Sequence, residues 1–408
     1  MPFILLVDKH IKTLKEKQME LKTMPKSSDI QKQKIRTLVA GVYDIQKLRI
    51  ATGNRIVQSF NIQMGQAPST KQDDMDKEAQ KLISKLRDEY KLITDAYIDR
   101  KYCKDKDGNL ISYGKSTINK KDGVNKNDDT QVSLTVIEFK KNESIEKVIN
   151  KMNTETMGVS NIRSKSDYDL IKSYMDLIDS EETMLSTVEK EVKKHPLWDM
   201  FFKDVKGCGP LMAAVCIAYF DVDRARHVSS FWKYAGLDTV PVTVDVEDED
   251  GNVIGKKDIR EGRGKKHAKF TKVTYIDKDG NEKEKCGLGY NPVLKTKLCG
   301  VLADCMIKAG LRTDKDTGVK VALSPYVQCL LDYRNRLDLR QDTKDYADGH
   351  KFNMARRYMI KQFVRDLWVV WRGAAGYEVS EPYEVAKLGN KPHKYNEAQC
   401  EVHRNTMK

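Results

Sequence analysis

Apolar side chains recur with a helical period along most of the chain, which predicts a mainly α-helical fold. One stripe lies within residues 28–64 and a second within residues 75–97, after a short polar loop. The first consists of Ile35, Leu38, Val39, Val42, Ile45, Leu48 and Ile56, and the second of Met75, Ala79, Leu82, Ile83, Leu86, Tyr90, Ile93 and Tyr97. We expect two long helices that form an antiparallel pair, each covering its stripe on the other or on a second subunit.

The helical period returns from Ser166 to Lys194 and predicts a long coiled helix that ends at His195. Near the N-terminus, the apolar run that ends at Asp8 could open a strand of an RNase-H-like nuclease, but the residues after it have a helical period. We therefore predict that residues 1–100 and 144–200 are mostly helical and that they contain no sheet of that kind.

Residues 101–143 are rich in Gly, Asn, Asp and Lys and predict a β-hairpin insertion or loop. Closely similar turn sequences begin at Asp105, Asp248 and Asp277, each with a glycine directly after a second aspartate. An EF-hand loop instead needs its glycine at the sixth position and a glutamate at the twelfth. These segments are therefore predicted to be the turns of three β-hairpins rather than calcium sites.

The stretch from Val205 to Phe220 places two glycines and a proline before an apolar segment, which predicts a helix-hairpin-helix. Gly207 and Gly209 are expected where a tight turn needs positive φ or no side chain, and Pro210 is expected at the first position of the second helix. The amides of such a turn, at the positive end of a helix dipole, would form a small anion site. That site suits a backbone phosphate of nucleic acid, although the same motif also occurs as plain helix packing.

Further helices are predicted in the C-terminal half. Residues 229–238 predict a short helix ended by Gly236, and Asn291 and Ser324, each followed by proline, predict the capped starts of two more. A last helix is expected near residues 353–372.

Lysine and arginine outnumber aspartate and glutamate by 73 to 60, so the 408-residue chain carries a formal net charge of +13. The densest basic run, residues 256–272, holds eight cations and two acids, and the last helix spaces three cations along one edge. Both features favour a polyanionic partner, with a solvated loop and an ordinary surface helix as the alternatives. The predicted nucleic-acid contacts are Lys206, Gly207, Cys208 and Gly209 in the turn, Arg260, Arg263, Lys265, Lys266, Lys269 and Lys272 in the basic run, and Arg356, Arg357, Lys361 and Arg365 in the last helix.

The eight cysteines show no paired spacing, so neither a zinc module nor a disulfide framework is predicted, and reduced intracellular thiols are expected. No stretch approaches the roughly 20 apolar residues of a membrane helix. We expect a soluble cytoplasmic protein, bacterial or viral, without a membrane partner. No cofactor is predicted, and a divalent metal would be needed only if a nuclease site existed.

The order of the C-terminal pieces resembles the C-terminal domain of the helix-hairpin-helix insertion-sequence transposases related to the pilin-inverting site-specific recombinases. In that family a G-x-G-P hairpin is followed by a Y-A-G-L segment, a G-N-x-x-L-R-type helix start and a final basic helix. The matching positions here are Gly207, Gly209, Pro210, Tyr234 to Leu237, Asn291, Leu294 and Lys295. The resemblance covers residues 198–377 and implies DNA handling in the recombination of a mobile element, with a dimerising coiled coil before the hairpin.

Two family features have no counterpart in the sequence. The RNase-H-like nuclease half is not visible, because the N-terminal half is predicted to be helical. The Ser-Gly that carries the family's catalytic serine after Y-A-G-L is also missing, since the chain continues with Asp238 and an acidic hairpin. No catalytic residue is assigned, so whether the chain is an enzyme stays open, and a non-catalytic role is favoured.

The expected organisation follows from these pieces. It comprises a helical domain at 1–100, a β-hairpin insertion at 101–143, a coiled helix at 144–196, a transposase-like helix-hairpin-helix domain at 197–377 with a β insertion at 239–290, and a tail at 378–408.

The favoured function is a DNA-binding protein of transposase or recombinase descent. It would contact the phosphate backbone of double-stranded or branched DNA without sequence specificity, as a homodimer or higher oligomer. One alternative is an active transposase or recombinase with a divergent active site, for which Asp8, Asp44 and Asp95 offer no recognisable motif. The other is a structural or assembly protein of a virus or mobile element.

Overall fold

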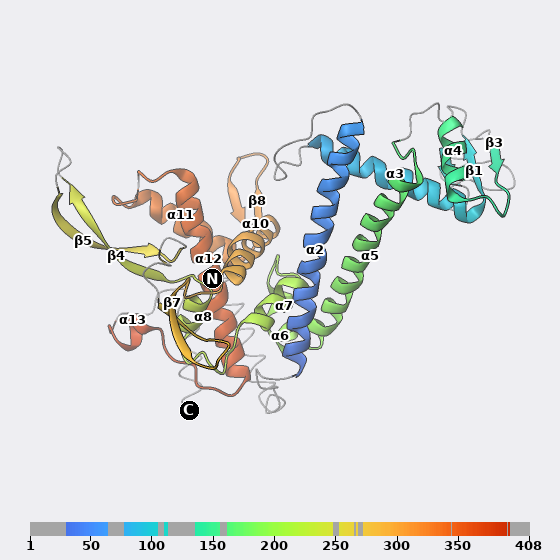
Figure 1. Ribbon diagram of the computed structural model, residues 1–408. Coiled ribbons are helices and arrows are strands. Elements are labelled where there is room, and N and C mark those ends of the chain that lie inside the picture. Colours follow the sequence, from blue (N-terminus) through green and yellow to red (C-terminus); the bar gives the residue numbers. More distant parts are fainter. Residues whose placement is uncertain are drawn as a thin grey trace. The chain divides into compact units, whose positions relative to one another are not determined.

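The computed structural model describes residues 30–63, 77–104, 110–112, 135–155, 161–247, 253–264, 267, 272–343, 345–389 and 391. Over these residues the chain is mainly α-helical, with small antiparallel sheets of two or three strands (Figure 1). The fold class predicted from the helical period is therefore confirmed. Among the described helices, none combines the length and apolar character that a membrane span requires.

The chain divides into two compact units, one of residues 40–185 and one that joins residues up to 39 with residues from 186 onward. Both divisions fall inside long helices, the first within α2 (Ile30–Gln63) and the second within α5 (Lys165–Lys193). The predicted boundaries at residues 100 and 196 do not coincide with them. An unbroken apolar stripe gives no sign of such a division, because the helical period continues across it.

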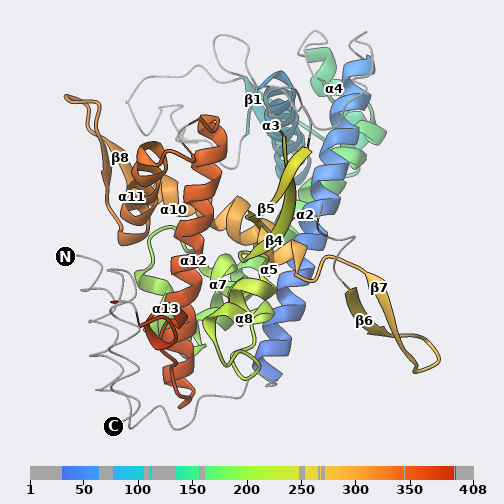
Figure 2. The same cartoon turned by 90° about the vertical axis from the view of Figure 1, so that its left-hand side faces the viewer.

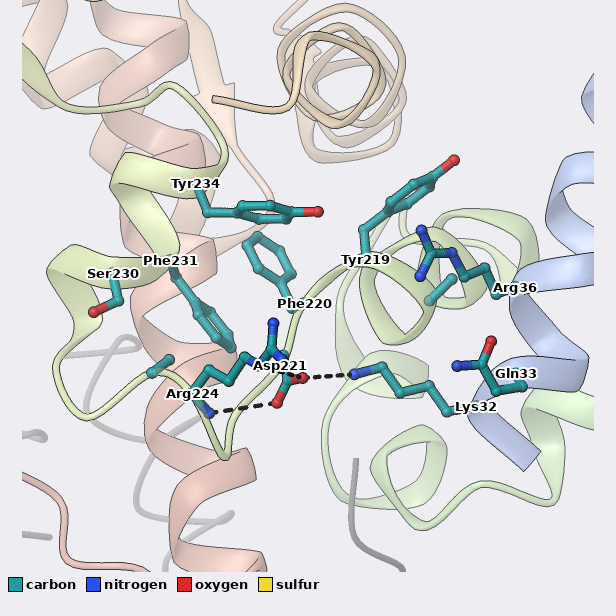
Figure 3. A pocket seen from close by; sticks show the side chains of 12 residues that line it. Lys32, Gln33, Arg36, Tyr219, Phe220, Asp221, Arg224, Ser230, Phe231 and Tyr234 are labelled. Atoms are coloured by element: carbon teal, nitrogen blue, oxygen red, sulfur yellow. Dashed lines mark hydrogen bonds and ion pairs between the residues drawn. The ribbon is translucent and has the colours of Figure 1, made fainter. Parts of the chain in front are cut away.

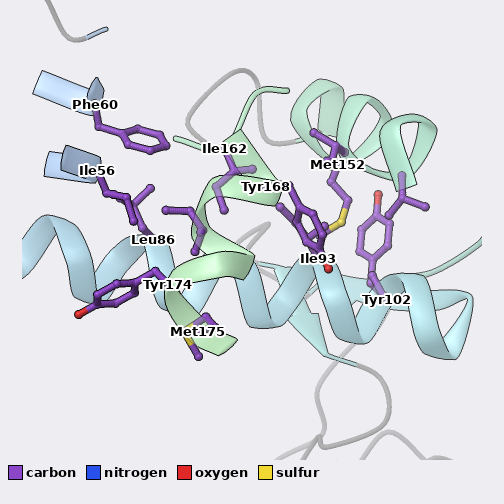
Figure 4. Packing of buried hydrophobic residues seen from close by; sticks show 14 of the residues in the cluster. Ile56, Phe60, Leu86, Ile93, Tyr102, Met152, Ile162, Tyr168, Tyr174 and Met175 are labelled. Atoms are coloured by element: carbon purple, nitrogen blue, oxygen red, sulfur yellow. The ribbon is translucent and has the colours of Figure 1, made fainter. Parts of the chain in front are cut away.

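The core of the 40–185 unit gathers apolar side chains from several helices (Figure 4). These helices are α2, α3 (Lys77–Asp99), α4 (Ile145–Glu155) and α5. Within this core the rings of Tyr90 and Tyr168 stack with centroids 4.9 Å apart. Burial raises the pKa of Tyr168 to about 12, so this side chain is neutral at physiological pH.

One small sheet belongs to the same unit. Strand β1 (Lys101–Lys104) lies between β2 (Leu110–Ser112) and β3 (Thr135–Glu138) and pairs antiparallel with both. This agrees with the predicted hairpin insertion. Over the described residues before 150, this three-stranded sheet is the only one, and the larger sheet of an RNase-H-like nuclease is not found there.

Helices α2 and α5 run antiparallel, as their contacts show (Figure 1). A Cβ atom on Gly53 would meet the Tyr174 ring at 3.2 Å, and Gln46 Nε2 donates to Glu181 Oε1 at 2.8 Å. The sequence predicted that the first long helix pairs with the next along the chain, α3, or with a second subunit. Helix α2 does contact α3, where a Cβ atom on Gly53 would lie 3.8 Å from Ile83 Cδ1, but its pairing with α5 was not predicted. A periodic stripe shows that a helix has an apolar face but not which other helix covers it.

The second unit is built around α7 (Pro210–Tyr219), in which every residue from Met212 to Ala218 is buried. The preceding short helix, α6 (Pro196–Met200), starts at His195, whose Nδ1 accepts a hydrogen bond from Leu197 N at 3.3 Å. A single 3-10 turn and the loop that contains both glycines then connect α6 to α7. The predicted start of α7 at the proline is confirmed.

The longest helix of this unit, α12 (Asp348–Ala374), packs against α8 (Val228–Tyr234) and α11 (Pro325–Leu339) (Figure 2). The Trp368 side chain of α12 is fully buried, and its indole N–H donates to Ala225 O at 2.8 Å. Residue Gly236 has φ +64° just after α8, as predicted for a helix end.

Two of the predicted hairpins belong to this unit. Strand β4 (Thr239–Glu247) pairs with β5 (Val253–Gly262), and β6 (Lys272–Ile276) pairs with β7 (Glu282–Cys286). In the β6–β7 turn, Asp277 Oδ1 accepts hydrogen bonds from the amides of Asp279 and Asn281 at 2.9 and 2.8 Å. The turns that begin at Asp105 and Asp248 lie outside the described residues.

The predicted helix after Asn291 is divided into α9 (Pro292–Thr296), a π-helical segment and α10 (Ala303–Gly310). Asn291 Oδ1 caps it by accepting from Leu294 N at 3.0 Å, and Ser324 Oγ caps α11 by accepting from Val327 N at 3.3 Å. Between α10 and α11 lies a hairpin that the sequence did not predict, formed by β8 (Leu311–Thr313) and β9 (Lys320–Ala322). A short helix, α13 (Tyr383–Ala386), is the last described element.

Candidate nucleic-acid interface

The turn before α7 is built around Gly207. Its φ is +84°, and a Cβ atom there would come within 2.5 Å of the Cys305 carbonyl oxygen. Cys208 N donates to Val205 O at 3.0 Å, and the Cys208 side chain is buried, which raises the pKa of its thiol. The turn therefore packs its Gly207 side against α10, and Cys208 belongs to the core. Lys206 is exposed.

Gly209, in contrast, does not require a glycine. It is the N-cap of α7 with φ −76°, and a Cβ atom there would meet nothing within 4 Å. The expectation that the turn needs both glycines is thus wrong for Gly209, because any residue can adopt this extended backbone. No described residue accepts a hydrogen bond from the amide of Gly207 or Gly209, so these donors remain available for a ligand.

The described part of the basic run is not all loop, although a glycine-flanked loop was expected. Strand β5 extends to Gly262, so Arg260 lies exposed on a strand. Arg263 is bound through two nitrogens to the Asp238 carboxylate, with Nε–Oδ1 and Nη2–Oδ2 distances of 2.8 Å, and its pKa is raised by these bonds. Arg263 therefore stabilises the fold through its ion pair with Asp238. Lys272 pairs with Glu284 across the β6–β7 hairpin at 3.1 Å. Three predicted contacts lie outside the described residues: Lys265, Lys266 and Lys269.

Arg356 and the first cation of the predicted α12 row, Arg357, also make internal contacts. Arg356 Nη1 lies 3.0 Å from Asp304 Oδ1. Arg357 donates to the carbonyl oxygens of Gly236, Leu237 and Asp238 at 3.2, 3.3 and 2.6 Å. These carbonyls belong to the segment that follows α8, and Asp238 O also accepts from Arg263 N at 3.1 Å, so Arg357 fixes this segment to α12. Burial lowers the pKa of Arg357.

The other two cations of the row face a cavity rather than open solvent. Trp232 Nε1 donates to Lys361 O at 3.1 Å, and Lys361 Nζ lies 4.3 Å from the centroid of the Trp232 ring. Arg365 is only 2% exposed and donates to Gln362 Oε1 at 2.6 Å and to Asp366 Oδ1 at 2.6 Å. The prediction that Arg357, Lys361 and Arg365 form a solvated row of cations is therefore wrong. This side of α12 faces the rest of the unit and the cavity rather than open solvent.

Lys361 and Arg365 line a cavity of about 950 Å³ that we call the cation–aromatic cavity. Its walls are formed by α8, α11, α12 and residues 378–388. Helix α11 contributes Arg336, and Arg340 directly follows the last residue of that helix. The rings of Tyr333 and Tyr358 stack in its wall with centroids 4.2 Å apart and planes at 18°.

Positive charge predominates on this lining. Five cationic side chains, Arg336, Arg340, Lys361, Arg365 and Lys387, face two carboxylates, Glu378 and Glu381. Arg365 is balanced by Asp366 and Arg340 by Asp342. Arg336 is exposed, and no described carboxylate lies within ion-pairing distance of it. Burial raises the pKa of Tyr358 to about 12, so its hydroxyl keeps its proton.

The α11 part of this cavity was missed from the sequence, although a signal exists. Tyr333, Arg336 and Arg340 are spaced three and four residues apart, which places them on one face of a helix. Tyr358, Lys361 and Arg365 repeat that spacing on α12. Two helices with matching aromatic and basic faces predict a shared site, but only if the helices are known to be neighbours.

No group of three or more histidine, cysteine, aspartate or glutamate side chains suited to a metal ion is found among the described residues. Asp44 and Asp95 lie on α2 and α3, and Asp8 lies outside the part of the chain that the structure describes. No protein-family model, curated protein or solved structure matches this chain.

Proposed function

We propose that this chain is a DNA-binding protein of transposase descent that contacts the phosphate backbone without sequence specificity and without catalysis. We further propose that the cation–aromatic cavity receives a part of the DNA in which bases are unpaired, as at a branch point. The observation that carries this proposal is the meeting of stacked tyrosines, a tryptophan and excess positive charge in one cavity.

Each part of the cavity has a role in this proposal. An aromatic ring offers a stacking surface to any base, at about 1–3 kcal/mol per base, and so reads no sequence. Arg336 and Lys361 would neutralise the phosphates on either side of that base. Fully paired duplex keeps its base faces covered, whereas a branch or a single strand exposes them. The site therefore favours branched or single-stranded DNA over blunt duplex.

The finer features inferred from the sequence belong to the same proposal. The loop with Gly207 between α6 and α7 supports its interpretation as a helix-hairpin-helix, whose amides and Lys206 would make a second backbone contact. The length of α5 supports the coiled-coil interpretation. On α2, Leu48, Ile50 and Ile62 are more than half exposed, which supports a homodimer formed through the long helices.

Fluorescence anisotropy with a labelled three-way junction, the matched duplex and a single strand, at a series of KCl concentrations, tests the proposal. Arg336→Ala should weaken binding to the junction and reduce the slope of log K against log [salt] by about 1, because one phosphate contact is lost. Arg312→Ala is the matched control, since Arg312 is exposed on β8 and does not line the cavity.

Equal effects of the two substitutions would overturn the role of the cavity. Absence of binding to all three substrates at low salt would overturn the function itself and favour a structural or assembly protein. Metal-dependent cleavage of the junction would instead support an active transposase or recombinase.

A further inference from the structure

A second cavity of the same unit, about 500 Å³ in volume, lies at the C-terminal end of α7 and takes no part in the proposed DNA site (Figure 3). Its lining comes from the first turns of α2, the end of α7 and α8. We call it the α7-end pocket. Its volume is within the range of about 300–1,000 Å³ that small-molecule sites occupy.

Three cations and one carboxylate line this pocket. They are Lys32, Arg36, Arg224 and Asp221. Lys32 Nζ lies 3.6 Å from Asp221 Oδ2, and Arg224 Nε lies 4.0 Å from the same oxygen, so neither approaches it closely. Asp221 Oδ1 also accepts hydrogen bonds from the amides of Asp223 and Arg224. The lining therefore contains one carboxylate and three cations, and its net charge is positive.

Of these cations, Arg36 and Arg224 are exposed at the rim, whereas Lys32 lies largely buried in the pocket. Its side chain is only 13% exposed. Burial lowers the pKa of Lys32, with Asp221 and Asp223 opposing the shift and Arg36 adding to it. A lysine that is buried beside a second cation and only loosely paired is suited to an incoming anion that would complete its neutralisation.

The remaining lining is aromatic. Phe220 and Phe231 are buried and stack with ring centroids 4.3 Å apart, which gives the pocket a fixed apolar floor. Tyr234 is 42% exposed and projects on one side of the pocket, while Tyr219 and Arg36 lie on the other (Figure 3). A planar ring could stack between these groups while an attached anion reaches the cations.

We propose that the α7-end pocket binds a nucleoside 5′-phosphate, with the base against Tyr219 and Tyr234 and the phosphate on Lys32, Arg36 and Arg224. The three cations of the lining outnumber Asp221, and with Asp223 nearby a net positive charge remains, which attracts a phosphate monoester that carries close to two negative charges at neutral pH. The nucleotide can be free, or it can be the phosphorylated 5′ end of a strand, since both present the same groups. The pocket and the cation–aromatic cavity share no lining residue, so the two sites can be tested separately.

Calorimetric titration of the full chain with AMP, UMP, adenosine and inorganic phosphate tests the proposal. We expect both monophosphates to bind, and adenosine and phosphate alone to bind at least about tenfold more weakly, because each lacks one half of the contacts. Arg224→Ala should weaken AMP binding about tenfold through the loss of a charge-assisted contact. Arg226→Ala is the matched control, because Arg226 is exposed two residues away and does not line the pocket.

A 5′-phosphorylated oligonucleotide and its 5′-hydroxyl form distinguish the two sources of the ligand. Competition with AMP by the phosphorylated form alone indicates a strand terminus, and competition by neither indicates a free nucleotide. No AMP binding, or equal loss in Arg224→Ala and Arg226→Ala, overturns the proposal. Arg336→Ala should leave AMP binding unchanged, so failure of the DNA site and failure of this pocket give different results. Thermal unfolding followed by circular dichroism confirms that each variant is folded.

Discussion

Gly207 and Gly209 stand in one turn but place different demands on the backbone. Gly207→Ala should lower the free energy of unfolding by at least about 2 kcal/mol, because the new Cβ meets the Cys305 backbone and φ is positive. Gly209→Ala should change it by less than about 1 kcal/mol, since its backbone is extended and the space beside it is open. Urea unfolding of both variants measures the difference, and equal values would contradict this account of the turn.

Arg263 is a second residue whose contacts in the fold differ from those that its sequence context predicted. The sequence predicted Arg263 to be a nucleic-acid contact in the basic run, where its removal would cost little stability. We now expect Arg263→Ala to lower the free energy of unfolding by about 1.5–3 kcal/mol, because it breaks two charged hydrogen bonds to the partly buried Asp238. Arg260→Ala, on the exposed face of β5, is the control and should leave the unfolding midpoint in urea unchanged. If Arg263→Ala left the free energy of unfolding unchanged, Arg263 would not be a stabilising residue.

We expect Lys32 to stabilise the folded protein less than an uncharged side chain of similar size would at the same position. Its pKa is lowered by burial, so below that pKa the lysine is charged in both states and folding carries the full penalty of burying the charge. As pH rises from the lowered value toward 10.5, the folded state releases the proton first and stability increases.

We therefore expect Lys32→Met to be more stable than the wild type at pH 7, with a smaller difference at pH 10, in urea unfolding at both pH values. The control Lys34→Met, on the same helix with its side chain 54% exposed, should show no such narrowing. If Lys32→Met were less stable than the wild type at pH 7, Lys32 would be a structural anchor instead.

At the scale of elements, the pairing of α2 with α5 depends on Glu181. This side chain is 8% exposed and accepts hydrogen bonds from Gln46 and Arg49 of the facing helix. Glu181→Ala should lower the free energy of unfolding by about 1.5–3 kcal/mol, because it leaves both donors without their acceptor. Glu182→Ala, one residue further along and exposed, should have little effect. Similar losses in the two variants would show that this contact does not determine the pairing.

Helix ends and hairpins could be predicted from the sequence because their causes are local. Asn291 and Ser324 cap the helices that follow them, and Gly236 ends α8, each through groups within a few residues. The β4–β5 and β6–β7 hairpins also follow from neighbouring residues. The pairing of α2 with α5 could not be predicted, since it depends on residues far apart in the chain.

The candidate site was less predictable for the same reason. The spacing of Arg357, Lys361 and Arg365 correctly placed them on one side of a helix. It could not show that α8 ends beside Arg357 or that Asp304 pairs with the neighbouring Arg356, because those contacts come from the tertiary fold. Spacing therefore identified the helix that lines the cavity but assigned its charges to the wrong environment.

At the scale of the whole molecule, the net charge of +13 overstates the charge available to a ligand. Many of the described cations are held in internal ion pairs, as Arg263, Arg356 and Arg365 are. Both the cation–aromatic cavity and the α7-end pocket have more cationic than acidic side chains in their lining. We therefore expect binding to polyanions to depend on a few positions rather than on overall charge.

The exposed apolar side chains of α2 predict self-association through the 40–185 unit. Helix α2 packs part of its surface on α5, but Leu48 and Ile62 remain 57% exposed on it. Burying such side chains stabilises an interface by about 1.5–3 kcal/mol each. We expect light scattering to show a dimer at tens of micromolar protein, and Leu48→Glu with Ile62→Glu to shift it to monomer, because the charges would be buried unpaired. Leu339→Glu alters an equally apolar, 87% exposed side chain of α11 and should leave the dimer intact. A monomeric wild type at this concentration would overturn the proposed dimer.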